Sequence, residues 1–233
     1  MKKKVIVVLI FFSFVSYCFA QNKEFGEEKP ISDVTGKIGL SVRISNISPD
    51  LDSYKNRDLD ADNELMWGIS LIYGINKWMS CELAFDTSSN IQIKDKTYNV
   101  KLTDLDLYPL TLSFKFKYIS TSPDIYQWMV PYVIVGAGYY FANGDADSEY
   151  KSYHTPNKVS LDIDGDFGWH AGGGIDFFIN KNIALGIEGR YFNTSISIEE
   201  KQHNPILNIN TSSDRDVDID GWILGANIKY FFR

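Results

Sequence analysis

The sequence has little cysteine, no long apolar run after its first twenty positions, and few histidines. Only one cysteine, Cys81, lies beyond residue 20, and a single cysteine cannot form an internal disulfide. No later stretch reaches the roughly eighteen consecutive apolar residues of a transmembrane helix. The three histidines stand in no known catalytic or metal-ligand motif, so we expect no enzyme, no cofactor and no catalytic residues.

Residues 1–20 have the layout of a secretory signal peptide. Lysines at positions 2–4 precede the apolar run Val5–Val15, and small residues stand three and one positions before Gln21. We therefore predict cleavage before Gln21, a polar periplasmic tail over residues 21–36 and one exported domain over residues 37–233. Cleavage leaves 20 basic and 30 acidic residues, a net charge of −10, which argues against nucleic acid as a partner.

The exported part repeats one unit, in which alternating apolar and polar residues are followed by turn residues. Alternation of period two is typical of a strand with two different faces. Each stretch is near the length of about nine to eleven residues that a tilted strand needs to cross a membrane. Eight strands are expected, at Lys37–Ser45, Glu64–Tyr73, Trp78–Asp86, Leu105–Tyr118, Val130–Ala142, Asp166–Phe178, Ile183–Phe192 and Ile219–Phe232.

The connections between these strands alternate in length, as in outer-membrane barrels with short periplasmic turns and long extracellular loops. Short to moderate connections are expected at 74–77, 119–129 and 179–182, and long polar ones at 46–63, 87–104, 143–165 and 193–218. The aromatic content of 15% is enough for two girdles at the membrane surfaces. The fold class is therefore all-β, an eight-stranded antiparallel up-and-down transmembrane β-barrel. We expect it in the bacterial outer membrane, with both termini periplasmic.

The apolar face of each strand is expected to meet lipid. A soluble lipocalin-like barrel also alternates, but the interior of eight strands is too narrow for so many bulky apolar side chains. The opposite face mixes charges with glycine and suits a crowded polar interior. The expected ionic network of the lumen comprises Lys37, Arg43, Glu82, Asp86, Lys115, Lys117, Asp176, Glu188, Arg190 and Lys229.

The short turn at Asn180–Asn182 predicts a specific pairing register for the two strands that it connects. If the strands before and after this turn pair directly, each large charged residue faces a glycine, which leaves it room inside a narrow barrel. The expected partners are Asp176 with Gly186, Glu188 with Gly174, and Arg190 with Gly172. Glu188 and Arg190 are then two residues apart on one face, near enough to pair.

Two segments of the second half resemble a known family. Leu107–Leu112 leading to Pro131–Phe141, and Gly168–Phe178 followed by Asn180–Asn182 and Gly189–Tyr191, are similar to the central strands of OmpW-type outer-membrane proteins. The resemblance implies an eight-stranded barrel with a narrow, largely hydrophobic channel for small apolar molecules. The charged inward face departs from that pattern. So does Arg233, since outer-membrane barrels usually end on the aromatic residue that the barrel-assembly machinery recognises.

Three pairs of aspartates are expected to begin strands at the extracellular rim. They are Asp104 with Asp106, Asp162 with Asp164, and Asp218 with Asp220. A ring of carboxylates there is a weak candidate for divalent cations that bridge lipopolysaccharide, and a solvated acidic rim is the plainer interpretation. His170 is the one histidine expected in the barrel wall, either as a packed interior residue or as part of the ionic network.

Two hypotheses for function remain. The first is porin-like passage of small solutes, hydrophobic ones among them, across the outer membrane. The alternative is a structural or surface-interaction barrel with a plugged lumen, whose long loops bind a partner. The expected surroundings in both cases are outer-membrane lipid and lipopolysaccharide. The charged inward face favours the second hypothesis, and the family resemblance favours the first.

Overall fold

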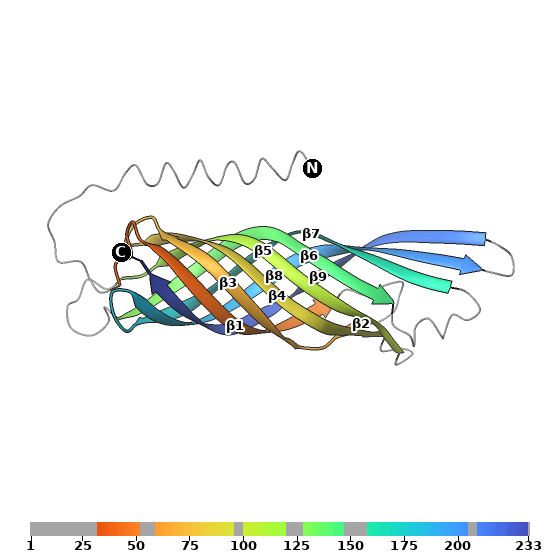
Figure 1. Cartoon of the computed structure of the whole chain (residues 1–233), viewed down its shortest axis with the longest axis horizontal. Helices are drawn as coiled ribbons and strands as arrows, with labels where there is room; N and C mark the ends of the chain where they lie inside the picture. The colour runs from red at the N-terminus through yellow and green to blue at the C-terminus, as the bar shows by residue number, and fades with distance from the viewer. Residues whose placement is uncertain are drawn as a thin grey trace.

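The computed structural model describes residues 32–51, 59–95, 100–119, 128–146, 158–204 and 209–232 (Figure 1). The predicted signal peptide, its cleavage site and most of the predicted tail lie outside these ranges. In the described part of the chain, no helix is long and apolar enough to cross a membrane.

The described chain forms strands alone. They are β1 (Ile38–Leu51), β2 (Leu59–Ala61), β3 (Glu64–Gly74), β4 (Met79–Asp95), β5 (Val100–Lys117), β6 (Met129–Ala146), β7 (Lys158–Phe178), β8 (Ile183–Asn204) and β9 (Ile209–Phe231). Each of the other eight strands pairs antiparallel with two neighbours in a ring, which β1 closes against β9. The short β2 pairs with β4. The prediction of a closed eight-stranded antiparallel β-barrel is confirmed.

The two ends of the barrel differ. At the turn end, residues 75–78 and 179–182 connect neighbouring strands, and both β1 and β9 have their outer ends there. At the opposite end, here called the loop end, β7, β8 and β9 project beyond the other strands (Figure 1). Their pairing runs on to Asn204 opposite Ile209, so the expected loop over residues 193–218 is largely a hairpin. The prediction stopped too early because polar residues dominate this part of the ladder, in which the apolar residues are Ile196, Ile198, Ile209 and Val217.

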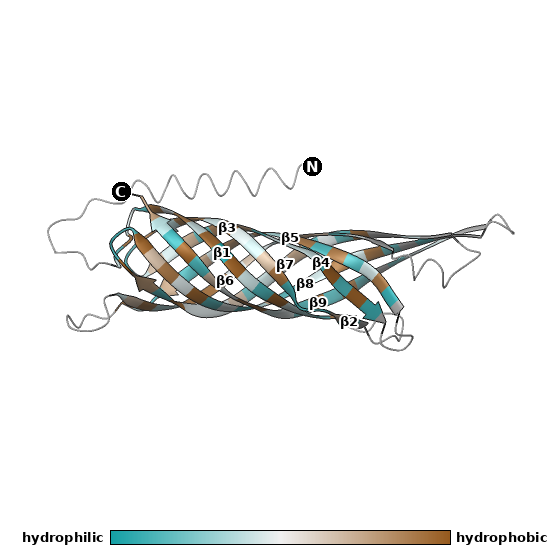
Figure 2. Ribbon diagram, turned by 60° about the horizontal axis from the view of Figure 1, so that its bottom comes forward, coloured by the Kyte–Doolittle hydropathy of each residue, from teal (hydrophilic) through white to brown (hydrophobic). Residues whose placement is uncertain are grey.

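The outward face carries the apolar side chains, so hydrophobic and hydrophilic residues alternate along each strand (Figure 2). Aromatic contacts mark one girdle near the loop end, where the rings of Trp169 and Tyr191 lie 5.9 Å apart and those of Tyr191 and Trp222 lie 5.6 Å apart. A second girdle near the turn end includes Tyr230 and Phe232. The ten residue steps from Trp222 to Phe232 span about 34 Å along β9. For a strand tilted by about 40° from the barrel axis this is roughly 25 Å along that axis, which matches the height of the apolar band of outer-membrane barrels.

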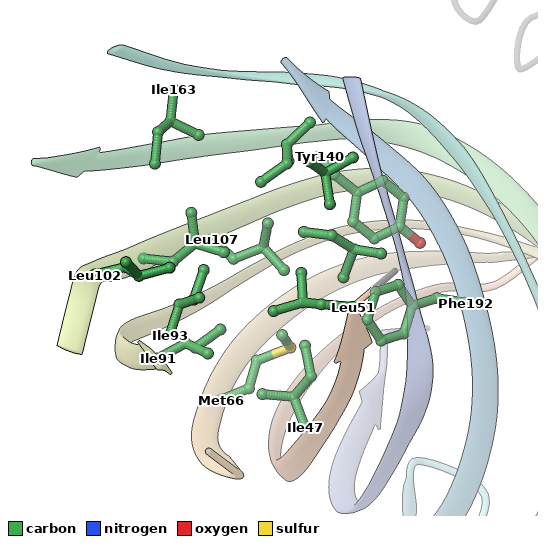
Figure 3. Close-up of a cluster of buried hydrophobic side chains, with 14 residues drawn as sticks. Ile47, Leu51, Met66, Ile91, Ile93, Leu102, Leu107, Tyr140, Ile163 and Phe192 are labelled. Atoms are coloured by element: carbon green, nitrogen blue, oxygen red, sulfur yellow. The ribbon is translucent and has the colours of Figure 1, made fainter. Parts of the chain in front are cut away.

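The expected crowded polar interior occupies only the middle of the barrel, because the interior is apolar at both ends. The loop-end apolar cluster consists of Ile47, Leu51, Met66, Ile91, Ile93, Leu102, Leu105, Leu107, Tyr140, Ile163, Phe192, Ile196, Val217 and Ile219 (Figure 3). The turn-end apolar cluster consists of Val34, Ile72, Ile119, Val130, Phe178, Ala184 and Phe231. Between them lies a tier of buried charged residues.

A bulge on β4 explains part of this difference. The pairing of β4 with β5 shifts between Ser88 and Ile91, and Asn90 has a φ of 65°. A bulge inserts an extra residue, so the inward face passes from even to odd positions. Ile91 and Ile93 therefore join the loop-end apolar cluster. Simple alternation from Glu82 and Asp86 would have placed them outside.

Candidate functional site in the barrel lumen

Six buried charged residues meet in the middle of the barrel and are called the central ionic cluster. They are Arg43, Glu82, Asp86, Lys115, Glu188 and Arg190. Arg43 holds Asp86 through two hydrogen bonds, Nε to Oδ1 at 2.9 Å and Nη2 to Oδ2 at 3.1 Å. Its Nη1 also lies 3.2 Å from Glu82 Oε1 and 3.6 Å from Glu188 Oε1. These residues come from β1, β4, β5 and β8, so the contacts tie together strands that are far apart in the sequence.

Lys115 and Arg190 complete the cluster. Lys115 Nζ lies 2.8 Å from Glu82 Oε2 and 2.9 Å from Glu188 Oε2. Arg190 pairs with Glu188 through Nε and lies 3.4 Å from Glu82 through Nη2. Three cations thus balance three carboxylates, which is how charges persist in a dry interior. Removing one member leaves the others uncompensated, so disrupting the cluster is costly.

The hairpin register expected for β7 and β8 is confirmed. Asp176 faces Gly186, Glu188 faces Gly174 and Arg190 faces Gly172. The glycines are required for space, since a Cβ on Gly174 would lie 2.6 Å from the hydroxyl of Tyr132. That hydroxyl donates a 2.6 Å hydrogen bond to Glu188. Large charged side chains therefore fit in the lumen because small residues face them.

The remaining members of the predicted network lie outside the central ionic cluster. Lys229 pairs with Asp176 nearer the turn end, and the ammonium groups of Lys229 and Lys115 lie 5.0 and 4.7 Å from the centre of the Tyr132 ring. Lys117 is buried on the inward face of β5. Lys37 is half-buried and donates a 2.7 Å hydrogen bond to the carbonyl of Lys181 at the turn end. The structure therefore brings six of the ten predicted residues into one cluster.

A chain of neutral polar side chains lies at the boundary between the central ionic cluster and the loop-end apolar cluster. Ser113 Oγ is 2.8 Å from His170 Nε2, and Tyr140 Oη is 3.4 Å from His170 Nδ1. Gly136 pairs with both Ser113 and His170, and a Cβ on it would lie 2.5 Å from His170 Nε2. The imidazole of His170 therefore lies over Gly136 and contacts Ser113 on the strand beyond it. No local sequence pattern predicts this contact, because Ser113 and His170 are 57 residues apart.

The hydrogen-bonded ladder between β6 and β7 ends beside the loop-end apolar cluster. Pairing between β6 and β7 ends at Tyr140 opposite Asp166, although β6 runs on to Ala146 and β7 begins at Lys158. Beyond that point β6 pairs with β5, and β7 pairs with β8. The unpaired residues 141–146 of β6 and 158–165 of β7 are here called the seam. The two strands still lie close together there, since a Cβ on Gly144 would lie 2.9 Å from Ile163 Cδ1. Packing and a hydrogen bond from the Tyr139 hydroxyl to the carbonyl of Gly165, in place of a ladder, hold the wall together here.

The aspartates of the predicted rim do not converge on a cation site. Asp104 pairs with Lys101 at 2.8 Å, and Asp106 accepts a 3.0 Å hydrogen bond from the Asn90 amide. At the other strands, Asp218 accepts from Ser195 at 2.7 Å, Asp220 accepts from Tyr191, and Asp164 is exposed. The side chain of Asp162 lies outside the described part. Within the described residues, no three His, Cys, Asp or Glu side chains are placed to hold a metal ion.

Comparisons with known proteins agree with this geometry. The sequence matches the model of the outer membrane protein beta-barrel domain family over residues 10–230, and no match is found among the curated proteins. The fold is similar to OprG from Pseudomonas aeruginosa, with a TM-score of 0.66 and 16% identity over 88% of this chain and 100% of that one. AlkL in lipid bilayers gives a TM-score of 0.52 and 18% identity over 91% and 97%. Neisserial surface protein A gives 0.50 and 16% over 84% and 97%.

At these identities the structural likeness shows the fold alone. The family match covers nearly the whole chain. Together with the fold, it confirms the resemblance to the small OmpW-type barrels and places the protein in the bacterial outer membrane. The chain belongs to the outer membrane protein beta-barrel domain family.

Proposed function

We propose that this barrel takes up small apolar solutes at its loop end and releases them sideways into the outer membrane. The loop-end apolar cluster is the observation that carries the proposal. Apolar side chains fill the mouth of the lumen, while charged residues close its middle. An apolar solute can replace contacts between apolar side chains at little cost, whereas passage through the middle would break buried ion pairs.

The seam between β6 and β7 supports a lateral exit. The ladder ends at Tyr140 opposite Asp166, and both Tyr140 and Ile163 belong to the loop-end apolar cluster. The outward aromatic residues Tyr139 and Phe167 lie at the same level, with ring centres 5.3 Å apart. A solute leaving here would enter the membrane near its interface without separating any β6–β7 ladder. Gly136, Gly138 and Gly172 to Gly174 are weaker candidates for an exit, because they lie in the continuous part of that ladder.

The proposal includes an orientation. The turn end, with the outer ends of β1 and β9, faces the periplasm, and the loop end faces the exterior. This is the usual asymmetry of outer-membrane barrels. It agrees with an amino-terminal signal peptide ending before Gln21, since the tail then remains on the side from which the chain was inserted. Trypsin added to intact cells tests it by cleaving in the loops, while residues of the turn end are protected.

A reversible cross-link across the seam tests the exit. In a Cys81→Ala background, Gly144→Cys combined with Ile163→Cys places two thiols where the side chain of residue 163 meets residue 144. Uptake of an apolar fluorescent tracer into vesicles should fall at least severalfold on oxidation and recover on reduction. The control pair Val133→Cys with Gly173→Cys joins register partners inside the ladder. Equal uptake in oxidised and reduced seam variants would contradict the lateral exit.

A second candidate is a surface-interaction barrel. It is favoured by the projecting hairpin of β8 and β9, whose outward face presents the exposed carboxylates Asp214, Asp216 and Asp218. Replacing residues 198–214 by a short turn tests this function. Loss of cell adhesion with unchanged tracer uptake would support it, and loss of uptake with unchanged adhesion would support transport.

A further inference from the structure

A buried hydroxyl near the middle of the lumen has no partner. Thr111 lies on the inward face of β5 and is 3% exposed, and its Oγ1 makes no hydrogen bond within the described part of the chain. Leaving such a group unpaired costs about 1–3 kcal/mol. Two positions along the same face, Ser113 is bonded to His170. The unpaired hydroxyl therefore points to a missing hydrogen-bonding group beside Thr111.

Thr111 lies where the loop-end apolar cluster meets the neutral chain of Ser113 and His170. Its partner on β6 is Gly138, which carries no side chain that could cover it. Tyr140, the next inward residue of β6, packs over Gly168 and sends its hydroxyl to His170 at 3.4 Å. This distance is long for a hydrogen bond between an oxygen and a nitrogen. Thr111 and Tyr140 thus present one unpaired and one weakly held hydroxyl on neighbouring strands.

Three other inward hydroxyls near the loop-end apolar cluster, those of Ser88, Thr103 and Thr194, have backbone partners. Ser88 donates to the carbonyl of Leu65 at 3.2 Å. Thr103 donates to the carbonyl of Asp104 at 3.1 Å, and Thr194 to that of Asp166 at 3.4 Å. Hydrogen-bonding capacity for a ligand is therefore concentrated at Thr111 and Tyr140.

The pairing of the charged residues next to Thr111 also limits the charge that a ligand can carry. Arg43, Lys115 and Arg190 are each held by carboxylates, so the central ionic cluster offers no spare cation to a carboxylate ligand. We propose that Thr111 and Tyr140 bind the polar group of a neutral amphiphile, such as an aliphatic alcohol, ketone or ester, whose chain occupies the loop-end apolar cluster. This inference rests on the proposed function, because it assumes that apolar solutes enter this cluster.

Methyl NMR of the refolded protein in lipid nanodiscs tests the subsite. Labelled isoleucine δ1-methyl groups at Ile47 and Ile196 report occupancy of the loop-end apolar cluster and stay in place in the variants. The probes are octane, 1-octanol and octanoate, added at equal mole ratios to lipid. One extra hydrogen bond predicts half-saturation by 1-octanol at a mole ratio about fivefold lower than that of octane. Octanoate should bind no better than octane.

Matched variants separate the subsite from the cluster around it. Thr111→Val removes the hydroxyl and keeps the shape, and it should abolish the advantage of 1-octanol over octane without lowering thermal stability. Tyr140→Phe should reduce the same advantage. Thr103→Val is the control, because Thr103 lies two residues from Leu105 on the inward face of β5 and already donates a 3.1 Å hydrogen bond to a backbone carbonyl. It should keep the full advantage.

The outcomes distinguish this inference from the proposed function. Equal binding of octane and 1-octanol to the wild type, or an unchanged advantage in Thr111→Val, would overturn the subsite and leave apolar uptake intact. Loss of stability in Thr111→Val with no change in ligand preference would assign the hydroxyl to a structural water and overturn the inference. If none of the three probes shifts Ile47 or Ile196, the proposed function itself fails.

Discussion

Arg43 and Asp86 meet across a strand that separates them. Arg43 on β1 faces Gly68 on β3, and Gly68 faces Asp86 on β4, so the two charged side chains join over a residue that has none. Their two hydrogen bonds, at 2.9 and 3.1 Å, form a bidentate pair in the lumen. Bidentate arginine–carboxylate pairs are among the stronger hydrogen-bonded contacts in proteins. The strength of this pair therefore reports how firmly the charged side chains are held in the middle of the lumen.

Arg43 and Asp86 should be strongly coupled in stability. Arg43→Met or Asp86→Leu alone leaves a buried charge uncompensated and should destabilise the barrel by about 3–5 kcal/mol. The double variant should lose much less than the sum, as urea unfolding in lipid vesicles would measure through a double-mutant cycle. The exposed pair Lys94–Asp62, at 2.7 Å, is the control and should show a coupling of about 0–1 kcal/mol. Additive losses at Arg43 and Asp86 would contradict a dry, paired lumen.

Gly68 should tolerate no side chain. A Cβ at this position would lie 1.8 Å from Asp86 Oδ1 and 3.1 Å from Arg43 Nε, so Gly68→Ala should destabilise by about 1–3 kcal/mol through overpacking. Gly189→Ala is the matched control, since its Cβ would meet only the end of the Leu224 side chain at 3.0 Å. Thermal unfolding of both variants in the same lipid compares them. Equal stability would show that Asp86 and Arg43 do not occupy the space above Gly68.

The membrane band should lie between the two aromatic girdles. Ile228 faces outward midway between Trp222 and Phe232, so Ile228→Arg should destabilise by about 2–4 kcal/mol, as expected for a cation at the bilayer midplane. Ser212 also faces outward but lies on the projecting part of β9, so Ser212→Arg should have little effect. Unfolding titrations in vesicles give both values. A similar penalty at the two positions would mean that the girdles do not bound the membrane.

The hairpin of β7 and β8 shows how much of the site is readable from the sequence. Period-two alternation places Glu188 and Arg190 on the inward face, and a short turn leaves one natural register. That register sets them opposite Gly174 and Gly172, as the structure confirms. The inward and outward faces of all eight barrel strands follow the same logic wherever the ladder is regular.

Irregular backbone and long-range contacts limited the prediction. The bulge at Asn90 changes which residues of β4 face inward, and no local sequence pattern predicts this bulge. The ionic network spans strands whose side-chain reach depends on the curvature of the closed barrel, so Lys37 and Lys117 could not be separated from Arg43 and Lys115 in advance. The contact of Ser113 with His170 requires the registers of β5, β6 and β7 together.

The most direct test of the account measures ion conductance and apolar uptake in the same vesicles. In the proposed function, the central ionic cluster closes the lumen to ions and water, while the loop-end apolar cluster and the seam between β6 and β7 give apolar solutes a path to the membrane. Correctly refolded protein, identified by its faster migration in SDS gels before boiling, should therefore take up an apolar fluorescent tracer with no single-channel conductance. Steady conductance together with uptake of hydrophilic solutes would contradict a closed lumen and show an open pore instead.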